Sequence, residues 1–337
     1  MKKQLKKVNL FNTKNILLLL LLILLLSIPF ICTSFDSGLY FLNVINYCFV
    51  YAIATIGLNI MTGYSGQINL GGAAYFAVGA YSVVILNNAG INIVISLILG
   101  LLIVGIFGLL TAIPAAKLKF HFLALATMAV GEVINNLLTV SPWGITNDTH
   151  GMFVNSMVLF GIKFNNDFKM YFLLFVATIV TLLFSWSFVK SRTGRACMAV
   201  RDNVDSAEGC GIDIKKYKII ATVTSCVIIG FAGFLFAYLN RYISPDTFSA
   251  GKSTMFMSMM MLGGSSTLLG PILGTVLITI IMESLRNLPQ VGMFFQLSYG
   301  IILLLVMMFM PQGLSGVIND LLLKRKMKRL NDGTFKN

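Results

Sequence analysis

Long apolar runs, separated by short polar segments, follow one another along almost the whole chain. A helix rises about 1.5 Å per residue, so crossing a hydrocarbon core of about 30 Å takes roughly 20 apolar residues. The pattern therefore predicts an all-α polytopic membrane protein with about ten transmembrane helices. The expected spans are Ile16–Ile31, Leu39–Met61, Gly72–Leu86, Ile91–Ile113, Phe122–Leu138, Met170–Val189, Ile219–Leu239, Thr254–Leu262, Pro271–Glu283 and Phe294–Met310.

Three of these runs differ from an ordinary span: two are short, and one resembles a signal peptide. Thr254–Leu262 and Pro271–Glu283 are too short to cross a bilayer alone. Either the segment between them, 263–270, lies partly inside the membrane, or the ends of the two helices extend. The first run follows several lysines, as in a secretory signal peptide, but no small-x-small cleavage site follows it. We interpret it as an uncleaved span.

The basic residues predict the orientation. Only 11% of the residues are charged, against about 25% in soluble domains, and the net charge of +13 comes from clusters between apolar runs, which argues against nucleic-acid binding. With the N-terminus inside, 20 of the 25 Lys and Arg residues face the cytoplasm. The inside set is Lys2, Lys3, Lys6, Lys7, Lys14, Lys117, Lys119, Lys190, Arg192, Arg195, Arg201, Lys215, Lys216, Lys218, Lys324, Arg325, Lys326, Lys328, Arg329 and Lys336. The outside set is Lys163, Lys169, Arg241, Lys252 and Arg286, and no basic residue is expected within a span.

The apolar runs and the basic clusters at both ends divide the chain into three parts. A basic cytoplasmic N-terminus (1–15) precedes a transmembrane domain (16–310), and a basic cytoplasmic tail (311–337) follows it. Both termini are therefore expected in the cytoplasm. The longest cytoplasmic loop, 190–218, belongs to the transmembrane domain.

Two carboxylates lie in or near the expected spans. Ionisable groups in lipid are costly and usually face a bundle interior or a polar path. Glu283 is interpreted as the end of its span, beside Arg286. Glu132 lies deeper, near Asn135 and Asn136, and both a polar interior contact and a functional role stay open for it.

Two glycine-rich segments interrupt the apolar pattern, Gly57–Gly72 and Leu262–Pro271. Glycine frees the backbone from helix, and broken backbone at membrane depth needs protein or a water-filled path to satisfy its polar groups. Such interruptions in both halves of a transporter point toward the translocation route. A tight turn with small packing residues explains the first segment equally well. The candidates for a translocation path are Asn59, Gly63, Ser65, Gly66, Gln67, Asn69, Glu132, Gly263 and Gly264.

The cytoplasmic loop carries its own helix signals. Ala196–Arg201 has helical composition, and Asp202 and Asn203 suit a turn or cap. Val204–Cys210 is expected to form a second short helix that Gly211 closes at the C′ position. Asp213 is a candidate cap for the next span. A structured loop needs a partner, although a basic topological anchor alone would explain its seven basic residues.

Motifs for catalysis and for ATP binding are missing. The chain has no GxxxxGK[ST], HExxH or GxSxG motif, and no Cys/His cluster. An enzyme is therefore not expected, and no cofactor is expected in this chain. The cysteines lack the spacing of metal ligands, and we interpret them as small apolar residues. They are Cys32, Cys48, Cys197, Cys210 and Cys226.

Four segments resemble the LivM-type permeases of branched-chain amino-acid ABC transporters. They are GLNIMTGYSGQINLGGAAYFAVGAY (57–81), SRTGRACMAVRDNVDSAEGCGI (191–212), ISPDTFSAGKS with MLGGSSTLLGPILGT (243–275) and MPQGLSG (310–316), in the family's order. The resemblance implies a prokaryotic inner-membrane importer of leucine, isoleucine or valine. It also implies a LivH-type permease partner, two cytoplasmic ATPases that bind the ATP, and an extracytoplasmic binding protein.

The resemblance also assigns the loop a role. It implies that the segment around Ala207, Glu208 and Gly211 is the coupling helix that docks on an ATPase, with Arg201, Asp202 and Asn203 leading into it. Glu-Gly-Cys-Gly stands where the family more usually has Glu-Ala-x-Gly, so Gly209 is expected to loosen that helix.

Alternatives remain at two levels. The family includes permeases for urea, short amides and other amino acids, so the substrate class is wider than the family name. An ion-coupled secondary transporter working alone would use an embedded acid, for which Glu132 is the strongest candidate. A channel or structural scaffold is the third hypothesis. Neighbouring ATPase and binding-protein genes would separate the first two hypotheses.

Overall fold

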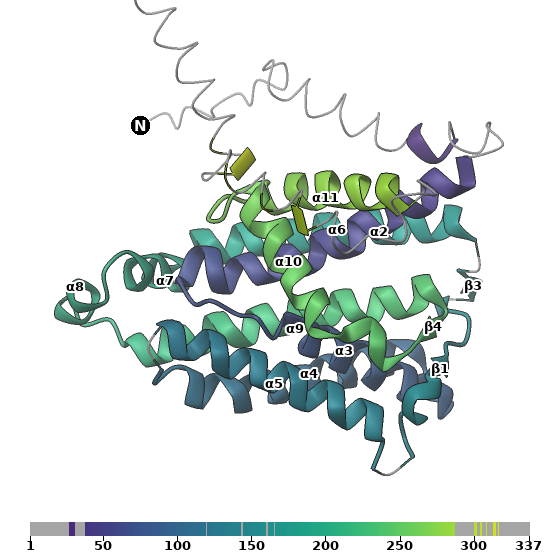
Figure 1. Cartoon of the computed structure of the whole chain (residues 1–337), viewed down its shortest axis with the longest axis horizontal. Helices are drawn as coiled ribbons and strands as arrows, with labels where there is room; N and C mark the ends of the chain where they lie inside the picture. Colours follow the sequence, from purple (N-terminus) through teal and green to yellow (C-terminus); the bar gives the residue numbers. More distant parts are fainter. Residues whose placement is uncertain are drawn as a thin grey trace, which may run out of the picture.

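The computed structural model describes residues 27–30, 38–118, 120–142, 144–159, 161–164 and 166–286, with isolated residues between 300 and 316. These residues form a helical bundle (Figure 1). Its α-helices are α2 (Gly38–Asn59), α3 (Gly72–Asn88), α4 (Ile93–Ala115), α5 (Phe120–Val140), α6 (Asp167–Lys190), α7 (Arg192–Asp202), α8 (Val204–Gly209), α9 (Ile214–Asn240), α10 (Ala250–Gly263) and α11 (Gly270–Arg286). The shorter elements are the π-helix η1 (Ile60–Tyr64), the 3-10 turns η2 (Asp148–His150) and η3 (Pro245–Phe248), and the strands β1 (Met152–Phe153), β2 (Val158–Leu159), β3 (Ile162–Lys163) and β4 (Tyr242–Ile243).

The eight expected spans from Leu39–Met61 to Pro271–Glu283 each coincide with a helix to within a few residues. Among the described residues, five helices are long and apolar enough to cross a membrane: Gly38–Tyr64, Ile93–Ala115, Phe122–Val140, Asp167–Lys190 and Ile214–Asn240. The first and tenth expected spans lie outside the described residues, apart from a few helical positions. A polytopic helical protein is therefore confirmed, and the total of ten spans stays a prediction.

Helix α9 lies at the centre of the bundle. Helices α2, α3 and α4 pack along it, α5 lies against α3 and α4, and α6 lies beside α2. Helices α10 and α11 pack against each other and over α2 (Figure 1). An aromatic core forms where α3, α9 and α10 meet, with the ring centroid of Phe76 5.2 Å from those of Phe236 and Phe256.

Helix α4 shows how an apolar sequence selects its packing face. Asn92 caps its start, with its side-chain oxygen 3.0 Å from the backbone nitrogen of Val94. Small residues recur every fourth position and are buried, while Ile and Leu on the other face are exposed. In lipid, small residues let helices approach closely and pack. The buried stripe is Ser96, Gly100, Val104, Gly108 and Ala112.

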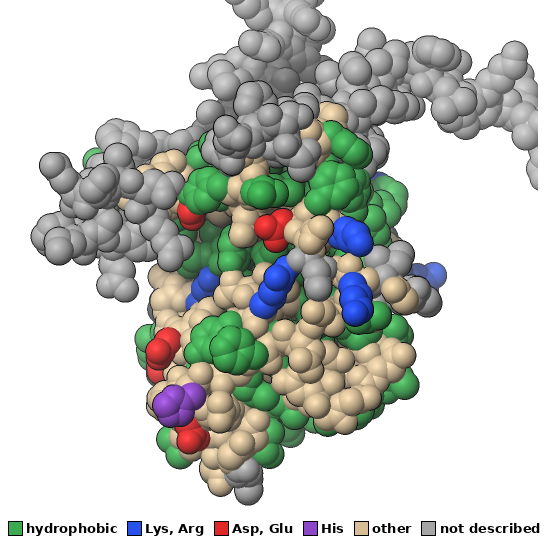
Figure 2. Space-filling view, turned by 90° about the vertical axis from the view of Figure 1, so that its right-hand side faces the viewer, with side chains coloured by type: hydrophobic (Ala, Val, Ile, Leu, Met, Phe, Trp, Pro, Cys, Tyr) green, Lys and Arg blue, Asp and Glu red, His purple; other side chains and the backbone are tan. Residues whose placement is uncertain are grey.

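The two ends of the bundle differ. Helices α7 and α8 project from one end, and the short strands lie at the opposite end (Figure 1). There β1 pairs antiparallel with β4, joining the loop after α5 to the residues after α9, and β2 pairs with β3. Figure 2 shows this second end, where basic and acidic side chains lie at the surface among hydrophobic and other side chains. The strand pairs were not expected. Which end faces the cytoplasm still rests on the distribution of basic residues.

Lys252 departs from the expected topology. It was expected in an outer loop, but it lies in the first turn of α10 and hydrogen-bonds Tyr51, the middle residue of Gly38–Tyr64. The cause is η3, which folds inward and buries Phe248 in the core, so that α10 begins well inside the bundle. The 14 residues of α10 span about 21 Å at 1.5 Å per residue, too short to cross alone.

Candidate functional site

The helical hairpin α7–α8 is built from local capping interactions. Ser191 caps α7, because its Oγ accepts a hydrogen bond from the backbone N–H of Gly194 at 3.1 Å. Asn203 ends α7 and also caps α8, with its Oδ1 2.9 Å from the backbone nitrogen of Ser206. Asp213 caps α9 in the same way, with its Oδ1 3.1 Å from the nitrogen of Lys216. The predicted helices and caps of this loop are confirmed.

Helix α8 ends at a left-handed glycine, as predicted. Gly211 has φ +76°, its N–H bonds the carbonyl of Glu208 at 2.9 Å, and the N–H of Ile212 bonds the carbonyl of Ala207 at 3.1 Å. This is the Schellman arrangement, which satisfies the last carbonyls of a helix. Ala207 is buried, whereas Glu208 is exposed. Gly209 is the last residue of the helix, so it does not interrupt α8.

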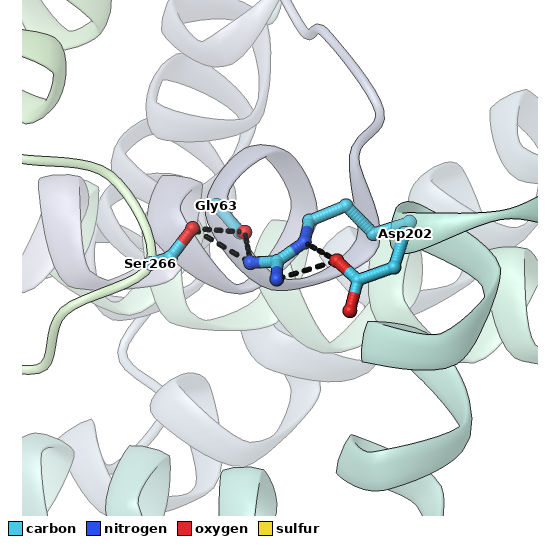
Figure 3. Close-up of polar contacts among 4 residues, drawn as sticks. Gly63, Asp202 and Ser266 are labelled. Carbon is cyan, nitrogen blue, oxygen red and sulfur yellow. Dashed lines mark hydrogen bonds and ion pairs between the residues drawn. The ribbon is translucent and has the colours of Figure 1, made fainter.

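Arg201 connects this loop to the membrane-embedded part. Its Nη1 donates to the carbonyl of Gly63 at 2.9 Å and to the hydroxyl of Ser266 at 2.7 Å. Its Nε and Nη2 donate to one carboxylate oxygen of Asp202 at 2.9 and 2.7 Å. Figure 3 shows the guanidinium between these groups. One side chain therefore joins α7, the π-helix η1 and the segment between α10 and α11.

Asn59 ties the two broken segments to each other. Its Nδ2 donates to the carbonyl of Thr267 at 2.8 Å, and its Oδ1 accepts from the N–H of Ser266 at 3.1 Å. Ser266 also donates to the Gly63 carbonyl at 2.7 Å. A Cβ atom at Gly63 would lie 2.0 Å from Asn59 Oδ1 and 2.7 Å from the backbone nitrogen of Ser266. Only glycine at this position admits the second segment against η1.

The polar residues after η1 face inward. Gln67 is 2% exposed, and its Nε2 donates to Ser65 Oγ at 2.9 Å and to the carbonyl of Lys218 at 3.1 Å. Asn69 is 1% exposed, and its Oδ1 accepts from the N–H of Gly71 at 2.8 Å. In this conformation these side chains satisfy the broken backbone and hold it against α9. A role in a translocation path stays a prediction for them.

Gly66 takes the backbone turn between η1 and this polar run. Its φ is +70°, a conformation that favours glycine. A Cβ atom there would lie 2.8 Å from Cγ of Arg201. Next to it is a pocket of about 520 Å³ at the α7 end of the bundle. Its polar lining is Ser65, Gly66, Gln67, Lys117, Arg201 and Lys218.

The remaining path candidates lie apart from one another. Gly263 ends α10, and Gly264, with φ +108°, begins the segment that reaches Arg201. Glu132 is exposed on the surface of α5 and makes no polar contact within the described chain. The polar interior contact considered for Glu132 is therefore wrong for this chain, because Asn135, not Glu132, is the α5 residue that bonds inward, to the carbonyl of Pro245 at 3.0 Å.

The cysteines are free thiols in the described chain. Cys48, Cys197 and Cys226 are buried, as expected for small apolar residues, but Cys210 is exposed after α8. Burial raises the pKa of the Cys197 thiol in α7 to about 11. Cys32 lies outside the described residues. Within the described residues, no group of three or more His, Cys, Asp or Glu side chains is placed to hold a metal ion.

Sequence reasoning missed Ser266, although it lies in a segment that was singled out. Its position in the middle of the Ser-Ser-Thr run between Gly264 and Gly270 was the available signal. A hydroxyl in a glycine-rich break can hydrogen-bond free backbone groups. The sequence could not indicate that the groups it reaches belong to Gly63 and Arg201.

Comparison with known families shows which protein family the chain belongs to. The family model described as "Branched-chain amino acid transport system / permease component" matches residues 40–310. The chain belongs to this permease family. The match covers every element of the described bundle except the first residues of α2 and the residues before it.

Individual permeases resemble the chain over most of its length. The high-affinity branched-chain amino acid transport system permease protein LivM of Salmonella typhimurium is 28% identical, over 79% of this chain and 67% of that protein. The probable LivM permease of Methanocaldococcus jannaschii is 25% identical, over 79% and 90%. The fructose import permease protein FruG of Bifidobacterium longum is 25% identical, over 70% and 71%. No solved structure gives a significant match.

Proposed function

We propose that this permease is the LivM-type subunit of an ATP-driven importer of leucine, isoleucine and valine in the inner membrane of a prokaryote. The names of the Salmonella and Methanocaldococcus relatives support this substrate class. A LivH-type permease completes the membrane part, two ATPases bind its cytoplasmic face, and a binding protein delivers the amino acid. Both termini of this chain lie in the cytoplasm.

The contacts of Arg201 carry the proposal. Helix α8 presents Asp205 and Glu208 to solvent at the end of the bundle and docks on an ATPase. A displacement of α8 moves α7, and Arg201 passes that displacement to η1 and to the α10–α11 segment through Gly63 and Ser266. A protein that worked without ATPases would not need its exposed loop bonded to both helix breaks.

In this scheme the candidate residues of the translocation path change their contacts during transport. The bonds among Asn59, Gly63 and Ser266 close the two breaks on each other, and their rearrangement accompanies opening toward the cytoplasm. Glu132 lies on an exposed face of α5 with Asn136 and the apolar side chains of Leu125 and Met128. A carboxylate facing lipid is costly, so we place this face against the second permease subunit.

The test is uptake by the assembled transporter in liposomes that contain ATP. We compare wild type with Arg201→Gln, and with Arg192→Gln as the matched control, because Arg192 lies on the same helix and is exposed. Loss of Arg201 removes charge-assisted hydrogen bonds to two elements. We expect leucine uptake to fall at least about tenfold, the equivalent of one such bond, while Arg192→Gln matches wild type.

The same assay compares leucine with urea and fructose, because a fructose import permease is among the relatives. Uptake that follows an ion gradient without ATP would overturn the proposal in favour of a secondary transporter. Uptake of fructose or urea, with none of leucine, would overturn the substrate assignment. Wild-type uptake in the Arg201→Gln transporter would remove the proposed role of Arg201.

A further inference from the structure

A lysine and a group of aromatic side chains meet deep in the bundle, on the side away from Arg201. The Nζ of Lys252 lies 2.7 Å from the hydroxyl of Tyr51, 4.3 Å from the centre of the Tyr51 ring and 5.2 Å from that of Phe236. Tyr47 stacks on Tyr51 at 5.9 Å and donates a hydrogen bond to the side-chain oxygen of Asn240. We call these five residues the Lys252 cluster.

The charge of Lys252 has no counter-charge in the described chain. The only ion pair there joins Arg201 and Asp202, far away at the α7 end. Lys252 is half-buried, and its neighbours offer one hydroxyl and two ring faces. A cation away from water is stable only when it is paired or hydrogen-bonded, and it has two further N–H donors to satisfy.

The helix that carries Lys252 adds to the positive potential. Lys252 lies in the first turn of α10, where there is no acidic residue. Helix N-termini carry partial positive charge and free N–H groups, so cations are disfavoured there and anions are favoured. The first turn is held in place by Ser253, whose Oγ accepts from the N–H of Ala73 at 2.8 Å. Fold and sequence thus concentrate positive charge at one fixed point.

The depth of the cluster suits a transported molecule. Tyr51 is the middle residue of Gly38–Tyr64, the α2–η1 helix that is long enough to cross the membrane. Helix α10 begins beside it and ends at the break that Arg201 reaches through Ser266. In transporters with broken helices, half-helix N-termini near the midplane point at anionic substrate groups.

We propose that the Lys252 cluster binds the carboxylate of the transported amino acid, with the aromatic rings receiving its aliphatic side chain. The proposal rests on the proposed function and adds a substrate criterion to it. A zwitterionic substrate neutralises Lys252 through its carboxylate, and the oxygens of Tyr47 and Asn240 are acceptors for its amino group. Neutral substrates such as fructose or urea give this cation no counter-charge.

The test uses the complete transporter, with saturating binding protein and leucine, in liposomes. We compare Lys252→Met, which keeps the length and removes the charge, with Lys252→Arg. The matched control is Lys169→Met, because Lys169 is an exposed lysine in the first turn of α6 at the strand end of the bundle. We expect Lys252→Met to lower leucine uptake about tenfold to a hundredfold, the worth of one charged hydrogen bond. We expect Lys252→Arg to retain most uptake and Lys169→Met to match wild type.

The outcomes separate this inference from the proposed function. If wild type imports leucine with ATP and Lys252→Met does so equally well, the site assignment fails and the proposed function stands. If wild type imports no amino acid at all, the proposed function itself fails. If the second permease subunit no longer copurifies with Lys252→Met, Lys252 pairs with an acid of that subunit, and the substrate assignment is overturned. Tyr51→Phe, which keeps the ring and removes the hydroxyl, gives a second and smaller loss of uptake if the inference holds.

Discussion

Replacing Gly63 by alanine tests the contact between the two helix breaks directly. The new Cβ atom would lie 2.0 Å from Asn59 Oδ1 and 2.7 Å from the backbone nitrogen of Ser266. The Asn59 side chain can rotate away, but only by giving up its bonds to Ser266 and Thr267. The backbone of Ser266 cannot yield without moving the whole α10–α11 segment.

The magnitude follows from three contributions. Overpacking a tight contact costs about 1–3 kcal/mol. Loss of the two Asn59 hydrogen bonds costs about 1 kcal/mol each. The better helix propensity of alanine offsets about 1 kcal/mol of this destabilisation. The expected destabilisation is therefore about 2–4 kcal/mol. At about 2 °C per kcal/mol for a large domain, the unfolding midpoint falls by about 4–8 °C.

The assay is thermal unfolding of the purified protein in detergent, with Gly105→Ala as the matched control. Gly105 lies inside α4, and its nearest contact for a new Cβ is an ordinary 3.6 Å to Val227. We expect Gly105→Ala to match or exceed the wild-type midpoint. A Gly63→Ala midpoint within 1 °C of that control would refute the reasoning. Adding Asn59→Ala should not rescue Gly63→Ala, because the clash with the Ser266 backbone remains.

Two further predictions concern the α7–α8 loop. Glu208→Arg should abolish transport and leave membrane insertion intact, because Glu208 is exposed at the proposed ATPase contact; normal uptake would contradict its role. Cys210 is exposed, so a membrane-impermeant maleimide should label it in inside-out vesicles and not in right-side-out vesicles. Cys197 should stay unlabelled at pH 7–8, because a pKa of about 11 keeps its thiol protonated and its side chain is buried. Labelling of Cys210 from the outside would reverse the proposed topology.

The features of this fold that depend on local chemistry could be predicted from the sequence. Apolar runs placed eight helices to within a few residues. Asn203, Gly211 and Asp213 were expected as caps and are caps, because capping involves residues only three or four positions apart. The two glycine-rich breaks were also located correctly.

Features that depend on tertiary packing could not be predicted. Arg201 bonds groups 138 and 65 positions away in sequence, so no local pattern indicates its partners. Polarity alone also left open whether Gln67 faces a path or its own backbone. Lys252 was counted with the outer loops because hydropathy does not reveal that η3 folds inward. For Glu132 a polar interior contact and a functional role were both open, because the exposure of one face of α5 depends on how the helices pack.

The capping of α8 has a consequence for how the loop meets its partner. A helix of six residues is far too short to be stable alone in water. Here Asn203 closes one end, the Gly211 turn closes the other, and Ala207 is anchored in the protein. An ATPase that binds α8 therefore meets a helix that is already ordered. Little conformational entropy is lost on association, and a rigid helix transmits displacement in both directions without first having to fold.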